Sequence, residues 1–125
     1  PEPPLMGTSP VERAQGEMWN RRIELEILLP LLNVFIHTHE MWKGVHTQIP
    51  EWGDICREKT LTSLAWLDGE IAGRDYIAND TYTIADITAQ CAIVMGKAVG
   101  IRVPEELENV SAWFARVAAR PTARA

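Results

Sequence analysis

Three histidines near the middle of the chain, His37, His39 and His46, are the residues best suited to metal or acid–base chemistry. The first two are separated by one residue, so on a helix their imidazoles point about 200° apart and cannot bind one metal ion together unless the helix has ended. The sequence therefore predicts no metal. It also shows no Ser/His/Asp or Cys/His arrangement and no glycine-rich phosphate loop. We expect no catalytic nucleophile in this chain.

The two cysteines, Cys56 and Cys91, lie within helical patterns and form no motif with each other. We expect both to be buried, reduced thiols of a cytoplasmic protein. The chain has no apolar run long enough to cross a membrane and no signal peptide, so contact with a membrane is not predicted.

The charge balance argues against a nucleic-acid partner. At 125 residues the chain is one domain, and its net charge is -5. Binding of phosphates needs clustered Lys and Arg, and the only local enrichment is Arg116, Arg120 and Arg124, spaced by four at the C-terminus. On a helix these form one solvated stripe near the negative end of the dipole, which we interpret as favourable electrostatics rather than a binding patch.

A helix start is encoded between Tyr82 and Ile87. Thr83 is placed as the N-cap, with its hydroxyl accepting the backbone N–H of Asp86 while the Asp86 carboxylate accepts the N–H of Thr83. Tyr82, before the cap, and Ile87 can pack together as a hydrophobic staple. Boxes of this kind begin ordinary helices in many proteins, so the box alone indicates structure rather than function.

The whole pattern predicts an all-α protein, a helical bundle with a long kinked first helix and a buried central helix. Residues 1–8 are proline-rich and without period, and we interpret them as an interdomain linker to a domain at 9–125. A second capping box, Ser9 to Glu12, begins the first helix, which continues to about Glu40 and bends at Pro30.

Three further helices follow. The second spans residues 51–71, with an apolar face that includes Ile55, Leu61, Leu64 and Leu67. The third begins at the Thr83 box, is the expected central helix and ends at Gly100. Asn109 is the expected N-cap of the last helix, which Pro121 ends.

These motifs occur in the order and at the spacing of a known family. The segments are Leu64-Ala65-Trp66-Leu67, Asp80-Thr81-Tyr82-Thr83-Ile84-Ala85-Asp86, Ser111-Ala112-Trp113-Phe114 and Ala119-Arg120-Pro121. Together they resemble the helical C-terminal domain of the glutathione transferase superfamily, bacterial type, over nearly the whole chain. One departure is Asn79, where the family usually has glycine; asparagine also tolerates positive φ, so we expect the turn to persist.

The resemblance implies partners that the chain itself does not contain. The family joins this domain to a thioredoxin-like N-terminal domain, and the chain shows no strand pattern of that kind. It also implies a homodimer, glutathione as co-substrate, and a small apolar electrophile as second substrate.

Site residues follow from the resemblance by position. In several classes of the family a carboxylate three residues after an Arg-Ala pair contacts the glutathione α-amino group bound to the other subunit, and here Arg13-Ala14 is followed by Glu17. A carboxylate suits an ammonium ligand, but Glu17 could equally pair with a neighbouring arginine on the helix surface. The family's electrophile pocket uses positions that match Asn20, Ile23, Glu24 and Ile27. The two isoleucines share one helix face and could equally be core.

The tryptophans divide into two groups. Trp66 and Trp113 lie inside the family-like segments and are expected in the core. Trp19 lies among Glu17, Arg21 and Arg22, and we expect it at an interface because an aromatic residue beside charges often marks one.

Two functions are therefore compatible with the sequence. The first is the electrophile-site and dimer-interface domain of a glutathione transferase, in which another domain activates the thiol. The alternative is a non-catalytic interaction module, because similar helical domains are attached to translation factors and aminoacyl-tRNA synthetases.

Overall fold

The structure is a computed structural model that describes residues 2–78 and 80–124, and for Thr122 and Arg124 the backbone only. The predicted turn at Asn79 and the place of the Arg124 side chain in the basic stripe lie outside the described residues. Every regular element in the described chain is helical, which confirms the all-α prediction. None of the helices in that part of the chain is both long enough and apolar enough to span a membrane.

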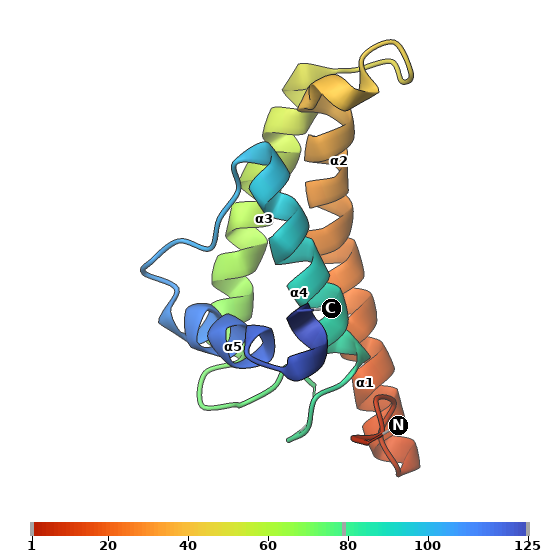
Figure 1. The fold of residues 1–125 in the computed structure, drawn as a ribbon, viewed down its shortest axis with the longest axis vertical. Helices are drawn as coiled ribbons and strands as arrows, with labels where there is room; N and C mark the ends of the chain where they lie inside the picture. Colours follow the sequence, from red (N-terminus) through yellow and green to blue (C-terminus); the bar gives the residue numbers. More distant parts are fainter. Residues whose placement is uncertain (1, 79, 125) are drawn as a thin grey trace.

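The first helical rod runs from Pro10 to Thr38 and lies alongside the helix that follows it (Figure 1). It consists of α1 (Pro10–Ile23), a π-helical segment η1 (Glu24–Leu28) and α2 (Leu29–Thr38). In η1 the Leu29 N–H donates to the Glu24 carbonyl five residues earlier, directly before Pro30, which has no N–H to donate. The predicted interruption at Pro30 is confirmed, and it takes the form of this wider turn.

The other elements pack around this rod. They are the short 3₁₀ turn η2 (Glu40–Trp42), α3 (Pro50–Glu70), α4 (Ile84–Gly96), η3 (Lys97–Val99), α5 (Glu108–Ala118) and a final 3₁₀ turn η4 (Pro121–Arg124). α4 contacts α1, α2 and α5, and it buries Ala85, Ala89, Ala92 and Gly96. Small side chains let the neighbouring helices approach closely, so α4 is the predicted central helix.

A buried carboxylate fixes the start of α4. The capping box of Thr83 and Asp86 is present, with the Thr83 N–H 2.8 Å from Oδ2 of Asp86. The same oxygen accepts the Thr83 hydroxyl at 3.1 Å, and Oδ1 accepts the Ile77 N–H at 3.0 Å and the Trp113 indole N–H at 2.8 Å. Asp86 therefore joins three parts of the chain: the segment before α4 that contains Ile77 (the crossing segment), the start of α4 at Thr83, and α5 through Trp113.

The predicted apolar face of α3 is half wrong. Leu64 and Leu67 are buried, but Ile55 and Leu61 are 56% and 38% exposed. The buried side instead includes Gly53, Cys56, Thr60 and Ser63. At Gly53 an added Cβ would lie 2.5 Å from Cγ2 of Thr38, so α3 approaches α2 through small residues rather than large apolar ones.

The N-cap assigned to Asn109 is also wrong, because Asn109 lies inside α5. One of the free backbone N–H groups at this helix start is satisfied from another helix. Oδ1 of Asp68 on α3 accepts the Val110 N–H at 2.8 Å, and its Oδ2 accepts the side-chain amide of Asn109 at 3.0 Å. A carboxylate from α3 therefore does the work that a local cap would do.

The predicted burial of one cysteine and the predicted interface position of Trp19 are corrected as well. Cys56 is buried as expected, but Cys91 is exposed; neither forms a disulfide. Trp19 is only 5% exposed and stacks on Trp66 with ring centroids 5.9 Å apart, so within the chain it belongs to the core rather than to an interface. The charges beside it are explained by Arg22, whose guanidinium carbon lies 4.7 Å from the centre of the Trp19 ring and 4.4 Å from that of Trp66.

Candidate functional site

The polar residues assigned to the site lie on the surface of α1 and η1. Glu17 and Glu24 are both bridged by Arg21, with 3.2 Å between Glu17 Oε1 and the guanidinium. The side chains of Glu17 and Arg21 are more than half exposed. Asn20 points to the central helix, where its Oδ1 accepts the Thr88 hydroxyl at 2.6 Å. The structure thus sets Asn20 against α4 with the two glutamates on the adjoining surface.

The two isoleucines assigned to the same site lie on the inner side of the rod. Ile23 and Ile27 are 0% and 1% exposed and belong to the main hydrophobic cluster with Leu64 and Leu67. They present no open surface within the described chain. Their role as a substrate wall stays a prediction.

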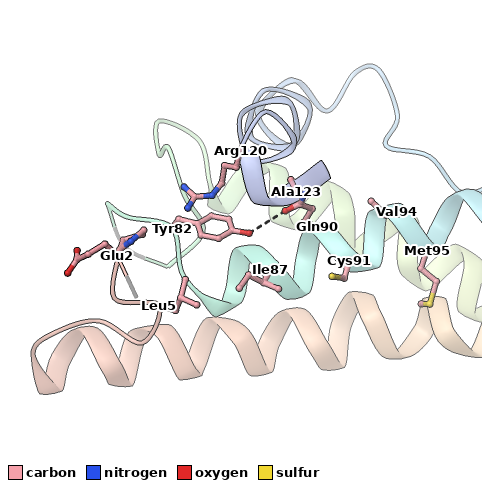
Figure 2. Close-up of a pocket in the computed structure, with 11 residues that line it drawn as sticks. Glu2, Leu5, Tyr82, Ile87, Gln90, Cys91, Val94, Met95, Arg120 and Ala123 are labelled. Atoms are coloured by element: carbon pink, nitrogen blue, oxygen red, sulfur yellow. Dashed lines mark hydrogen bonds between the residues drawn. The ribbon is translucent and has the colours of Figure 1, made fainter. Parts of the chain in front are cut away.

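An apolar groove runs along α4, and its lining includes Ile87, the residue before Thr88 in the sequence. It has a volume of about 690 Å³, and its walls come from the N-terminal segment, α4 and the chain after α5. Figure 2 shows Ile87, Cys91, Val94 and Met95 following one another along α4, with Leu5 beside them. Val94 is half exposed. The groove is large enough for a small molecule or for the side chains of a packed domain.

The polar end of this groove is built around Tyr82. Its ring packs under Arg120, whose guanidinium carbon is 3.8 Å from the ring centre, and its hydroxyl lies 3.4 Å from Oε1 of Gln90 (Figure 2). Burial raises the pKa of the Tyr82 phenol above its usual value of 10.0, and the nearby Arg120 cation only partly offsets this. Tyr82 is therefore a neutral donor at physiological pH. Nε of Arg120 is buried and has no hydrogen-bond partner among the described residues.

The N-terminal segment is fastened to this site. The Ile84 N–H at the start of α4 donates to the Leu5 carbonyl at 3.2 Å, so Leu5 satisfies one of the free N–H groups of the helix. The predicted staple residues Tyr82 and Ile87 both line the groove. The capping box thus positions one wall of the groove as well as beginning the helix.

The histidines are not brought together as one site. Nδ1 of His37 accepts the Ile49 N–H at 3.0 Å, and Nδ1 of His39 accepts the Met41 N–H at 3.2 Å. Both fasten the loop between α2 and α3. In the described part of the chain no group of three or more His, Cys, Asp or Glu side chains is placed to hold a metal ion.

Comparison with known proteins identifies the family. The model named "Glutathione S-transferase, C-terminal domain" matches residues 30–121. Glutathione S-transferase 2 of Saccharomyces cerevisiae is 33% identical over 98% of the chain, which spans 53% of that protein. The chain belongs to the glutathione S-transferase C-terminal domain family. The predicted resemblance is confirmed.

Solved structures of glutathione S-transferases share this helical arrangement. The crystal structure of Gtt2 from Saccharomyces cerevisiae has a TM-score of 0.89 at 33% identity, over 98% of this chain and 60% of its own. A glutathione S-transferase domain-containing protein from Marinobacter aquaeolei VT8 gives the same score and identity over 98% and 61%. A Gtt2-class enzyme of Vibrio parahaemolyticus gives 0.84 at 29% identity over 98% and 57%. The chain thus spans little more than half the length of these relatives.

Sequence reasoning missed most of the groove. Gln90, Cys91 and Arg120 were not selected, although Arg120 stands in the Ala-Arg-Pro segment that carried part of the resemblance. The signal for Cys91 was its spacing, since Ile87, Cys91 and Met95 are four residues apart and share one side of the central helix.

Proposed function

We propose that this chain is the electrophile-site domain of a cytoplasmic glutathione transferase that conjugates glutathione to a small apolar electrophile. A thioredoxin-like domain activates the thiol, and this chain supplies apolar surface. The observation that carries the proposal is the apolar groove along α4, the helix that Asn20 contacts through Thr88, in a chain of the glutathione S-transferase family.

The groove is the surface that the thioredoxin-like domain adjoins. Leu5 lines it while bonded to the start of α4, so a domain connected through residues 1–8 begins at its edge. Packing against that domain would cover Val94 and Cys91, which are exposed here. The electrophile then binds at this junction. By the resemblance, Asn20, Ile23, Glu24 and Ile27 would contribute to the electrophile site from the first rod, although none of them is among the described residues that line the groove.

Glu17 binds the α-amino group of glutathione held by the other subunit of a homodimer. Its present partner, Arg21, is more than half exposed, and ion pairs of this kind contribute about 0–1 kcal/mol. An ammonium ligand can therefore replace Arg21 at little cost.

The first test compares this chain with the longer protein that contains it, using glutathione and a chromogenic electrophile. We expect glutathione-dependent turnover by the longer protein and none by the chain alone. Substantial turnover by the chain would contradict the assignment of thiol activation to another domain. No turnover by the longer protein would overturn the proposed function.

The second test separates the two substrates. In the longer protein Glu17→Gln should raise KM for glutathione up to about tenfold, the scale of one charge-assisted hydrogen bond, without raising KM for the electrophile. The matched control is Glu58→Gln, an exposed glutamate on α3. Equal effects of the two variants would remove Glu17 from the site.

The alternative function, a non-catalytic module of the kind attached to translation factors or aminoacyl-tRNA synthetases, is not favoured. The relatives at 29–33% identity over 98% of the chain are glutathione S-transferases.

A further inference from the structure

Two histidines hold the loop that joins α2 to α3. The Ile49 N–H donates to Nδ1 of His37 across 3.0 Å, and the Met41 N–H donates to Nδ1 of His39 across 3.2 Å. We call residues 39–49 the α2–α3 loop, and Figure 1 shows it at the end of the first rod that is remote from the N-terminus. A ring nitrogen accepts a hydrogen bond only through its lone pair, so both contacts require a neutral imidazole with an unprotonated Nδ1.

A protonated ring cannot keep either contact. Imidazolium carries a proton on both nitrogens, so at each position an N–H donor would face another donor. His37 lies in the last turn of α2, where the backbone carbonyls accommodate a positive charge. The helix end therefore tolerates proton uptake by His37, whereas the bond to the Ile49 N–H does not.

The charged groups around the two rings do not oppose proton uptake. The charged or titratable side chains of η2, the α2–α3 loop and the first two turns of α3 are Glu40, Lys43, His46, Glu51, Asp54 and Arg57. The three carboxylates outnumber Lys43 and Arg57, and Arg57 is turned to the Val99 carbonyl at 2.9 Å. Within the described chain none of these groups forms an ion pair with His37 or His39.

The closed loop also contains an unsatisfied donor. The Trp42 ring packs on Phe35 and His46, with ring centres 6.0 and 4.9 Å apart. Its indole N–H is buried and has no hydrogen-bond partner among the described residues. Burial without an acceptor disfavours the closed arrangement, and water can reach this N–H when the loop opens.

We propose that the α2–α3 loop is a pH-sensitive switch, closed while His37 and His39 are neutral and released from the end of α2 when they are protonated. A histidine side chain in water takes up its second ring proton near pH ~6.5, so release occurs in mildly acidic solution. The Gln48 amide donates to the Ile36 and His39 carbonyls, both at 2.9 Å, and does not titrate. Release therefore loosens the loop without detaching it. The switch needs neither glutathione nor the proposed function.

The first experiment measures amide hydrogen exchange of this chain at about pH 7.5 and about pH 5.5, with each rate corrected for intrinsic exchange. Loss of one hydrogen bond lowers the protection of its N–H by up to about tenfold. We expect a loss of that size at the Ile49 and Met41 amides and no loss along α4. Equal protection of the two loop amides at both pH values would overturn the proposal.

The second experiment separates proton uptake from loop sequence. In the double variant His37→Asn/His39→Asn a carboxamide oxygen replaces each Nδ1 as acceptor but does not titrate, so the pH response should disappear. The matched control is His46→Asn, because His46 accepts neither loop N–H, and this variant should respond as wild type does. A response that persists in the double variant, or disappears in His46→Asn, would overturn the proposal.

A third measurement does not depend on how the variants fold. Imidazole ¹⁵N NMR of the wild-type chain follows proton uptake by His37 and His39 directly. The midpoints of these titrations should coincide with the loss of protection at the Ile49 and Met41 amides. Rings that titrate while both amides stay protected would refute the switch.

Discussion

Replacing Asp86 by alanine should be among the most destabilising polar changes in the chain. The side chain is 0% exposed and accepts four hydrogen bonds: from the Thr83 N–H, the Thr83 hydroxyl, the Ile77 N–H and the Trp113 indole N–H. Alanine leaves three N–H donors buried without an acceptor, because only the hydroxyl can rotate to another partner. Each unsatisfied donor costs about 1–3 kcal/mol.

The expected loss for three donors is therefore about 3–9 kcal/mol, comparable with the whole stability of many domains. Asp86→Asn should cost less, about 2 kcal/mol, since its carbonyl oxygen can keep the Ile77 and Trp113 bonds. Its amide would face the Thr83 N–H, which loses its acceptor, and the Thr83 hydroxyl, which can rotate to accept from the amide. Asp54→Ala, at an exposed aspartate of α3, is the control and should change stability by less than about 0.5 kcal/mol.

Chemical denaturation followed by circular dichroism measures these differences. A double-mutant cycle with Thr83→Val adds a test of the unit, since Thr83→Val and Asp86→Ala should be sub-additive when both act on one capping box. If the Asp86→Ala variant, the Asp54→Ala variant and the parent all unfold at the same denaturant concentration, the Asp86 carboxylate does not hold α4, α5 and the crossing segment together. The explanation of how the groove wall is positioned would then be wrong as well.

Three further outcomes are expected. Hydrogen bonds from the Ser9 N–H, and from the hydroxyl and N–H of Thr8, lower the pKa of the Glu12 carboxyl from 4.5 to about 2. The stabilisation by ionised Glu12 is thus present above about pH 4.5 and lost as pH falls towards 2. Glu12→Gln should therefore flatten the pH dependence of the melting temperature in that window. Asp68→Ala, which removes the cap on Val110, should lower the unfolding free energy by about 1–2 kcal/mol in denaturant titration. Cys91 should react rapidly with a thiol reagent, whereas Cys56, 3% exposed and with its pKa raised by burial, should react only on unfolding; equal rates would contradict the burial assigned to Cys56.

The helices could be predicted from the sequence because their ends are written locally. The Ser9–Glu12 and Thr83–Asp86 boxes, the interruption at Pro30 and the stop at Gly100 each depend on residues within a few positions of one another. The start of α5 was misassigned for the opposite reason. Its cap is Asp68, which lies 42 residues before Val110, and no local pattern carries that information.

Burial was less predictable than helix position, because a helical period says that one side is apolar without saying which neighbours cover it. Ile55 was assigned to the core on period alone, yet it is exposed. On α3 the small residues Gly53 and Thr60 are buried instead, and Ile55 lies on the exposed side. The interface predicted at Trp19 was wrong for a similar reason: Arg22, one of the charged residues beside it, stacks on the buried ring.

The same limit explains the division among the site residues. A substrate wall and a packed core both require apolar side chains four residues apart, so the spacing of Ile23 and Ile27 could not distinguish them, and burial assigns both to the core of the domain. Asn20, by contrast, is half-buried, and its Oδ1 accepts the hydroxyl of Thr88 on α4, the residue after Ile87 of the groove. This polar contact joins the surface of α1 to the helix that carries the groove, which apolar spacing alone could not show. If that reasoning holds, Thr88→Val should loosen Asn20 and alter electrophile KM in the longer protein more than it alters melting.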